Sequence, residues 1–291
     1  MKHTIFAQID TRTAEGRTGT LYINQDQWSG WIFNGDGTAT ADVYATLWGL
    51  AELVTGDGKN WNKIEGYNGD PGKMPIGQTV DYSKLTRIIP TKILIIKGTV
   101  HENKKDDIKK QIKKAVQVLN PQQVAVLFDY SIDVIEPKTT GRVELLNIEI
   151  GVDSTPDDKS YNEELMKKIG NGIISKDGEI IPLFDPDEKI FTQIYTDKIK
   201  NHTHTPNTKV LDGFAFYEIP TMILTESAYT LDTTIAHEIC HNFGLNDIAD
   251  PNQINNLMYN NNNRTGYNLE LDEVNLIKKK LEKYSELYIS R

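Results

Sequence analysis

Two histidines and a glutamate near the carboxyl end of the chain have metal-binding spacing. The motif is H-E-x-x-H-x-x-G-x-x-D, with fixed positions at His237, Glu238, His241, Gly244 and Asp247. On a helix the two imidazoles lie one turn apart on one face, where they can hold one Zn²⁺. Glu238 is placed to act on water as a general base rather than as a ligand. Gly244 permits a sharp turn, so Asp247 can return as a third ligand and leave one coordination position open, as catalytic zinc sites do.

The residues around this motif predict a buried helix. Its apolar positions recur at helical spacing: Ile235, Ala236, Ile239, Cys240 and Phe243. Asp232 is the expected N-cap, and Gly244 is expected to end the helix. Because buried histidines need polar or metal partners, this setting favours a metal site over a solvated histidine pair. Cys240 points away from the ligand face and is expected to be a small buried apolar residue.

With these residues the segment resembles the metzincin metallopeptidases, in the subset whose third ligand is aspartate. That family places a methionine in a tight turn beneath its zinc, and Met258 follows the motif at about the family's distance. The resemblance also implies a final helix, for which residues 271–284 supply an apolar stripe. Some members carry a tyrosine two residues after the methionine to assist the oxyanion. That position is Asn260 here, so Tyr259 and Tyr267 are the weaker candidates.

Other metal ligands remain open on the sequence alone: Asp250, Glu270, Glu273, His202 and His204. The two glutamates would suit a different class of zinc peptidase, in which the third ligand is a downstream glutamate. The H-x-H pair lies in a polar stretch typical of a solvated loop. Asp247 is preferred because it alone has the glycine at the required offset.

The periodicity of residues 91–291 predicts an α+β catalytic domain. Residues 92–97, 123–135, 143–152, 213–219 and 221–225 are expected to be strands, and residues 108–119 an amphipathic helix. This order is that of a metzincin catalytic domain, with a mixed sheet above the cleft. Residues 154–207 are long and polar, and we expect an elaboration between strands that shapes the cleft or its specificity.

Residues 1–90 have a different composition, rich in tryptophan, glycine and threonine. Within residues 40–82, a T-L-W-x-L-A segment, a W-x-x-I segment, Asn68 and a closing P-x-G-Q-x-V segment follow one another. This pattern resembles a LysM module, a small β-α-α-β domain whose family binds glycans such as peptidoglycan or chitin. The resemblance implies Trp48, Trp61 and Asn68 as candidate glycan-binding residues. The chain has Tyr44-Ala45 where the family has Gly-Asp, and that turn borders the glycan groove.

A turn at residues 33–36, Phe-Asn-Gly-Asp, also resembles the pattern by which astacin-type propeptides place an aspartate on the zinc. This resemblance implies that Asp36 reaches the metal, and the sequence leaves open whether residues 1–90 inhibit the enzyme.

Composition sets outer limits on function. A net charge of −9 argues against a nucleic-acid partner and an anionic membrane surface, and no apolar run is long enough to span a bilayer. One cysteine excludes an intrachain disulfide. No signal peptide is visible at the start of the sequence. Because a glycan-binding module joined to a protease makes an intracellular role less attractive, we still expect a secreted protein. Its signal would have been removed, or a specialised apparatus would export it. By resemblance only, the combination fits a bacterial effector or toxin.

We therefore expect a zinc-dependent endopeptidase that hydrolyses peptide bonds of a protein substrate, with a LysM-like module that targets it to a cell wall or glycan. Two alternatives remain: an amidase or endopeptidase acting on peptidoglycan peptides, and a non-enzymatic glycan-binding protein with a structural metal site. Glu238 argues against the second alternative, because a structural site needs no base beside it.

Overall fold

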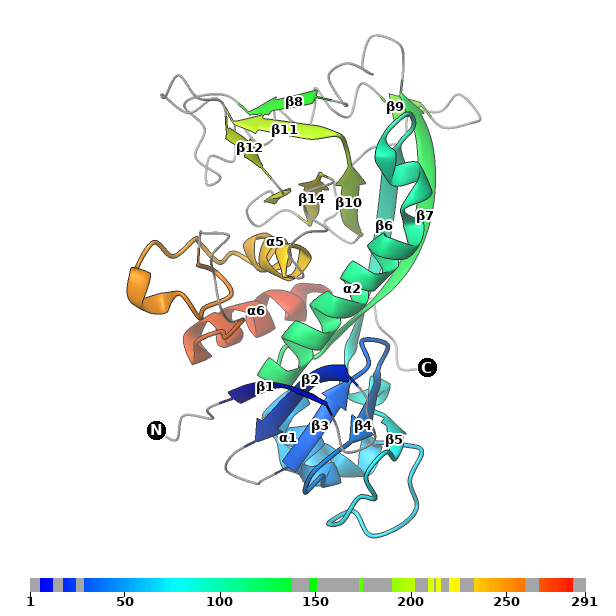
Figure 1. Ribbon diagram of the computed structural model, residues 1–291, viewed down its shortest axis with the longest axis vertical. Coiled ribbons are helices and arrows are strands. Elements are labelled where there is room, and N and C mark those ends of the chain that lie inside the picture. The colour runs from blue at the N-terminus through cyan, green and yellow to red at the C-terminus, as the bar shows by residue number, and fades with distance from the viewer. Residues whose placement is uncertain are drawn as a thin grey trace.

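The structure is a computed structural model that describes residues 6–12, 18–24, 29–137, 147–150, 173–174, 190–201, 209–211, 213–215, 220–225, 233–259 and 267–284. Two sheets, each with its own apolar core, organise this part of the chain (Figure 1). The sheet of the N-terminal unit has five antiparallel strands, and the larger sheet has six strands in mixed orientation. Across the described residues, no helix combines the length and apolarity needed to cross a membrane.

The N-terminal sheet runs in sequence order through β1 (Phe6–Arg12), β2 (Thr18–Asn24), β3 (Ser29–Phe33), β4 (Thr38–Ala41) and β5 (Thr79–Asp81). Between β4 and β5 lie α1 (Leu47–Thr55) and the 3-10 helix η1 (Gly58–Lys63). Thr46 caps α1 by accepting from the Gly49 amide at 2.9 Å. Trp31, Phe33, Leu50 and Leu53 are buried in the core of this unit.

The order of elements from β4 to β5 matches the expected strand-helix-helix-strand order, with two differences. The second helix is a 3-10 helix, and β1, β2 and β3 extend the sheet beyond the predicted module. The sequence pattern predicts no strand at Ser29–Phe33, where β3 lies. Trp31 and Phe33 on β3 are at most 2% exposed and pack with the α1 side chains, so they belong to the same core.

The larger sheet has the order β13 (Gly213–Ala215), β14 (Thr221–Leu224), β10 (Phe191–Tyr195), β6 (Arg87–Ile96), β7 (Val126–Pro137) and β9 (Ile173–Ile174). The four inner strands are parallel, and β13 and β9 are antiparallel to their neighbours. After β6, the chain passes through the 3-10 helix η3 (Val100–Asn103), α2 (Lys105–Leu119) and η4 (Asn120–Gln122) before it enters β7. A short 3-10 helix, η2 (Ser83–Leu85), links the two sheets.

The central strand β10 corrects the prediction for residues 154–207. All five of its residues are buried, and it pairs with both β6 and β14. Thr192 and Gln193 interrupt the apolar pattern, so its place in the sheet is set by its neighbours rather than by periodicity. A three-stranded sheet of β8 (Asn147–Ile150), β11 (Lys198–Asn201) and β12 (Lys209–Leu211) lies beyond it. His202, His204 and most of residues 154–207 lie outside the described residues.

The first strand of the larger sheet begins earlier than predicted. Strand β6 starts at Arg87, and its first residues, Arg87 to Ile89, pair in parallel with Val126 to Phe128 of β7. The boundary drawn between residues 90 and 91 therefore falls inside β6, and the change from one core to the other occurs between Tyr82 and Ile89.

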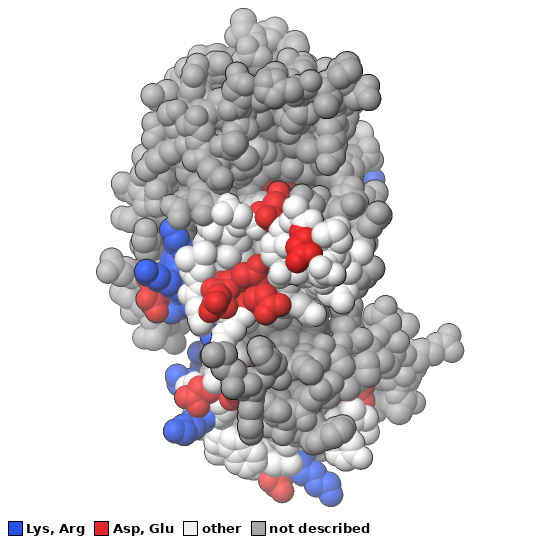
Figure 2. Space-filling view, turned by 90° about the vertical axis from the view of Figure 1, so that its left-hand side faces the viewer, with Lys and Arg blue, Asp and Glu red and all other residues white. Residues whose placement is uncertain are grey.

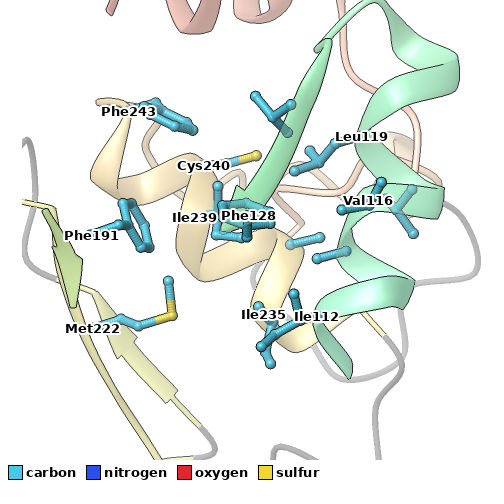
Figure 3. Close-up of a cluster of buried hydrophobic side chains, with 14 of the residues drawn as sticks. Ile112, Val116, Leu119, Phe128, Phe191, Met222, Ile235, Ile239, Cys240 and Phe243 are labelled. Atoms are coloured by element: carbon cyan, nitrogen blue, oxygen red, sulfur yellow. The ribbon is translucent and has the colours of Figure 1, made fainter. Parts of the chain in front are cut away.

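Helix α5 (Thr234–Asn242) lies between the larger sheet and α2 and carries the motif histidines (Figure 3). The predicted apolar face is confirmed: Ile235, Ala236, Ile239, Cys240 and Phe243 are all at most 1% exposed. In Figure 3 these side chains meet Phe191 of β10, Phe128 of β7 and the apolar face of α2. Predicted N-cap Asp232 lies outside the described residues, and Thr233 stands at the cap position without a side-chain cap bond.

The chain after α5 completes the same core. A segment containing the 3-10 helix η6 (Pro251–Gln253) leads to Leu257 and Met258, which are fully buried in this core. The final helix, α6 (Leu271–Tyr284), buries Val274, Ile277 and Leu281 as predicted, whereas Leu271, which the sequence places on the same apolar stripe, is 58% exposed. The elements that hold the motif are thus fixed by one continuous core.

Candidate metal centre

Three side chains of the motif converge. The Nε2 atoms of His237 and His241 lie 3.1 Å apart, and Asp247 Oδ1 lies 3.3 Å from the first and 3.5 Å from the second. The histidines are largely buried, with side chains 9% and 14% exposed, whereas the Asp247 side chain is 47% exposed. Among the described residues this is the one group of histidine, cysteine and acidic side chains close enough to share a metal ion.

A helix-ending turn brings Asp247 to the histidines. Gly244 has φ +88°, the left-handed conformation that glycine adopts without steric cost. Its amide donates to the His241 carbonyl at 2.8 Å, and the Leu245 amide donates to the Cys240 carbonyl at 3.0 Å. This pair of bonds is a Schellman motif, which satisfies the last carbonyls of α5 and reverses the chain. The motif glycine is therefore required by the backbone geometry.

Both imidazoles are oriented by backbone carbonyls. His237 Nδ1 donates to the Leu257 carbonyl at 2.8 Å, and His241 Nδ1 donates to the Leu245 carbonyl at 2.7 Å. A carbonyl can only accept, so each ring carries its proton on Nδ1 and presents the Nε2 lone pair to the shared space. Two lone pairs that face each other at 3.1 Å repel unless a cation or a proton lies between them.

The turn that carries Met258 supplies one of these carbonyls. Asn256 Oδ1 accepts from the Met258 amide at 2.7 Å, and the Asn256 side-chain amide donates to Glu273 Oε2 at 3.0 Å. The Leu257 amide donates to the Asn268 carbonyl at 2.8 Å. Hydrogen bonds from the turn itself, from Asn268 in the segment before α6 and from α6 thus fix the Leu257 carbonyl against His237.

Glu238 lies next to the histidines and is 7% exposed. It packs against Gly213 at the start of β13, where an added Cβ would stand 2.8 Å from Glu238 Oε1. A side chain at position 213 would therefore displace the carboxylate. Sequence reasoning did not identify Gly213, although a glycine in a strand is a signal for close approach of another group.

The charges of the site are coupled. Burial lowers the pKa of His241, but its hydrogen bond to Asp247 and the charge of Glu238 outweigh burial and raise that pKa to about 8. Burial acts to raise the pKa of Asp247, whereas its hydrogen bonds to His237 and His241 bring that pKa well below its usual range. In the absence of a metal, Asp247 is therefore ionised, and near neutral pH the His241 imidazole is positively charged, with a proton on both ring nitrogens.

The donor set fits zinc. Ligand atoms at zinc–nitrogen and zinc–oxygen distances in a tetrahedron lie about 3.3 Å apart, close to the three separations of 3.1, 3.3 and 3.5 Å. Neutral imidazoles and a carboxylate are common zinc ligands. His237, His241 and Asp247 would therefore hold the ion.

The other acidic candidates have different partners. Asp250 caps η6 by accepting from the Asn252 amide at 2.9 Å. Glu273 accepts from the Glu270 amide and from Asn256, and neither glutamate belongs to the metal group. Of the described candidates, Asp247 is the one whose carboxylate reaches both imidazoles.

The expectation that Asp36 reaches the metal is wrong. Its carboxylate accepts from the hydroxyl of Thr38 at 2.7 Å and lies 3.9 Å from Lys113 on α2. The turn docks there because Gly35, with φ +81°, lies directly against the Lys113 backbone. In this structure the N-terminal unit therefore packs against α2 rather than supplying a carboxylate to the metal group.

The remaining predicted site residues are two tyrosines between α5 and α6 and three residues of the N-terminal unit. Tyr259 and Tyr267 are half-buried, and Lys114 Nζ lies 5.7 Å from the Tyr267 ring centre. Trp48 is 39% exposed, and its ring lies 5.5 Å from that of Trp61. Asn68 is exposed on the same unit, and Asn260 lies outside the described residues.

Acidic side chains gather on one face of the described part of the molecule. Figure 2 shows acidic side chains gathered in the middle of this face, with basic side chains near its edge. The described chain from α5 to α6 has exposed acidic residues at Asp247, Asp250, Glu270 and Asp272. Such a surface attracts cationic segments of other molecules.

No protein-family model matches the chain, and no curated protein matches its sequence. Among solved structures, it is distantly similar to metalloproteinase-II from Bacteroides fragilis, with 14% identity, a TM-score of 0.36, and coverage of 92% of this chain and 84% of that chain. It is also similar to a zinc-dependent peptidase from Methanocorpusculum labreanum, with 12% identity, a TM-score of 0.31, and coverage of 66% and 99%. These similarities are remote, and the interpretation of the site rests on its own geometry.

Proposed function

We propose that this protein is a zinc-dependent endopeptidase. The observation that carries the proposal is the convergence of the two Nε2 atoms and Asp247 Oδ1 beside Glu238. Three protein ligands leave a coordination position open, and the exposed side of Asp247 gives solvent and substrate access. A structural site would be closed by a fourth protein ligand, and the described residues bring none to this group.

Glu238, His237 and His241 would each have a separate role in peptide hydrolysis. Zinc bound here supplies a Lewis acid that acidifies water and polarises a carbonyl oxygen. Glu238 accepts the proton from the attacking water and delivers it to the leaving amine. His237 and His241 would present their Nε2 lone pairs to a bound zinc, because their Nδ1 protons are donated to the Leu257 and Leu245 carbonyls.

The end of the larger sheet offers a place for an extended peptide. Among the described strands, β13 is one of the two terminal strands of this sheet, and its glycine lies against Glu238. A peptide that added to this edge would have its backbone next to the catalytic carboxylate. This geometry supports a protein or peptide substrate and leaves its sequence preference open.

Metal analysis combined with a peptidase assay tests the proposal. Purified protein should hold about one zinc per chain and should cleave an unfolded protein substrate. Activity should disappear with a chelator and return with added zinc. Asp247→Ala should lose its zinc much more readily than the matched control Asp250→Ala. Equal zinc loss in both variants would contradict the ligand assignment.

We also propose that the N-terminal unit directs the enzyme to a glycan outside the cell. The exposed ring of Trp48 beside Trp61 supports this role, since aromatic faces of this kind can stack on sugars. The full chain should sediment with insoluble peptidoglycan or chitin, and Trp48→Ala should reduce this. No sedimentation of the unaltered protein would overturn the targeting role and leave the peptidase assignment intact.

A further inference from the structure

Gln122, the last residue of η4, joins parts of the chain that are distant in sequence. Gln122 is 5% exposed, and both ends of its amide group are bonded. Its nitrogen donates to the Val118 carbonyl at 2.7 Å, and its oxygen accepts from the Leu269 amide at 2.7 Å. Leu269 stands two residues before α6, so this side chain ties the end of α2 to the approach to the final helix.

From Leu269, a series of hydrogen bonds leads to the metal centre. Its neighbour Asn268 holds the Met258 turn from both sides, accepting from the Leu257 amide at 2.8 Å and donating to the Asn255 carbonyl at 3.0 Å. The Leu257 carbonyl then accepts from His237 Nδ1 at 2.8 Å. Three residues therefore connect the amide of Gln122 to the His237 ring: Leu269, Asn268 and Leu257.

The N-terminal unit is attached at the same point of the chain. The Gln123 amide donates to the Leu53 carbonyl at the end of α1, at 3.0 Å. Gln123 has φ +67°, an uncommon conformation for a residue other than glycine, held by its contacts on both sides. The backbone that places Gln122 is thus also the backbone that docks the N-terminal unit.

We propose that Gln122 is a positioning residue for the metal centre, which sets the Leu257 carbonyl, and through it the His237 ring, by fixing Leu269. This inference rests on the proposed zinc site. Loss of the glutamine leaves the Leu269 amide without its buried acceptor, so the segment before α6 shifts or admits water. The Met258 turn then loses its fixed partner at Asn268, and the His237 ring loses its fixed carbonyl.

The expected loss of zinc affinity depends on how many hydrogen bonds separate Gln122 from a zinc ligand. Removal of a group that bonds directly to a ligand imidazole commonly weakens metal binding by about 10- to 100-fold. Gln122 acts two hydrogen bonds further out, through the Asn268–Leu269 peptide and Leu257, so the expected loss of zinc affinity in Gln122→Met is at most about tenfold, the low end of that range. Methionine preserves the length and packing of the side chain while removing both hydrogen bonds.

The chain offers a matched control on the helix that precedes η4. Gln111 of α2 is 8% exposed, and among the described residues its Oε1 has no hydrogen-bond partner. Gln111→Met therefore changes the same residue type at similar burial without touching the chain of contacts.

Two measurements on the full chain test the inference. The first is amide hydrogen exchange at Leu257 in metal-free protein, which reports the turn whether or not zinc binds. The second is the dissociation constant for zinc itself, with the visible spectrum of the cobalt-substituted protein as a check on ligand geometry. Gln122→Met should speed exchange at Leu257, weaken zinc binding and alter the cobalt spectrum, and Gln111→Met should change none of these.

The outcomes separate this inference from the proposed function. Unchanged Leu257 exchange in Gln122→Met, or equal effects in the two methionine variants, overturns the positioning role even if the protein is an active zinc enzyme. Absence of zinc binding by the unaltered protein overturns the proposed function, whereas the exchange result still decides whether Gln122 fixes the turn. If Gln122→Met does not fold, Gln122→Asn, shorter by one carbon, makes the same test.

Discussion

His237 Nδ1 donates to the carbonyl oxygen of Leu257 at 2.8 Å, across twenty residues of sequence. This bond joins the helix that carries the ligands to the turn that carries Met258. It fixes the ring tautomer and leaves Nε2 as the metal-facing atom. The methionine turn therefore has a definite role in this protein, since its backbone orients a ligand and its side chain fills the core below α5.

Zinc affinity should fall as the pH is lowered below about 8, the pKa of His241 in the metal-free chain. Below that pH a proton occupies the nitrogen that must bind zinc, so affinity should decrease by up to about tenfold per pH unit. Titrations in buffers of different ionisation enthalpy would also show proton release on binding at neutral pH. An affinity that does not change between about pH 8 and about pH 6 would contradict the assignment of His241 as a ligand.

Gly244→Ala should weaken both folding and zinc binding. The residue has φ +88°, and a Cβ in the left-handed region costs about 1–2 kcal/mol. Relief of that strain would move the turn that returns Asp247 to the histidines. Denaturant unfolding and zinc titration check the two effects. Gly244→Asn, which tolerates this conformation better, is the control and should be the milder variant; the opposite order would refute the strain argument.

Gly213→Ala should lower the turnover number while zinc stays bound. The added methyl group would stand 2.8 Å from Glu238 Oε1, so the carboxylate must move away from its present position. A fall of about 100-fold is expected, the low end of the contribution of a positioned general base. Zinc content and hydrolysis rate measured on the same preparation separate the effects. Unchanged turnover would show that the position of Glu238 against β13 is immaterial.

Tyr82 makes the protein sensitive to alkali. Burial raises the pKa of Tyr82 well above its usual range. Because the folded-state pKa exceeds the unfolded value, its contribution to stability is complete below about pH 10 and is lost as the pH rises further. Tyr82→Phe should remove this alkaline loss but cost about 1–3 kcal/mol at neutral pH, because Asn120 donates to the Tyr82 hydroxyl at 3.1 Å. Alkaline unfolding curves that are identical in the two proteins would argue against this role.

The sequence predicted best where local spacing determines structure. The motif residues, the apolar face of α5 and the stripe of α6 all follow helical periodicity, and the structure has both helices. The sequence predicted least where contacts with residues distant in sequence determine the structure. Strand β10 contains Thr192 and Gln193, and its burial depends on β6 and β14. Gly213 and Gln122 acquire their importance from Glu238 and Leu269, partners 25 and 147 residues away that no local pattern reveals.

The central claim, that Glu238 acts as the base beside a zinc ion held by three side chains, is tested most directly by the hydrolysis rate of zinc-loaded Glu238→Gln. This change keeps the shape of the side chain and removes its ability to take a proton. The account predicts that the variant binds zinc as tightly as the unaltered protein and loses nearly all peptide hydrolysis. A zinc-loaded Glu238→Gln protein that cleaves peptides at the unaltered rate would contradict it.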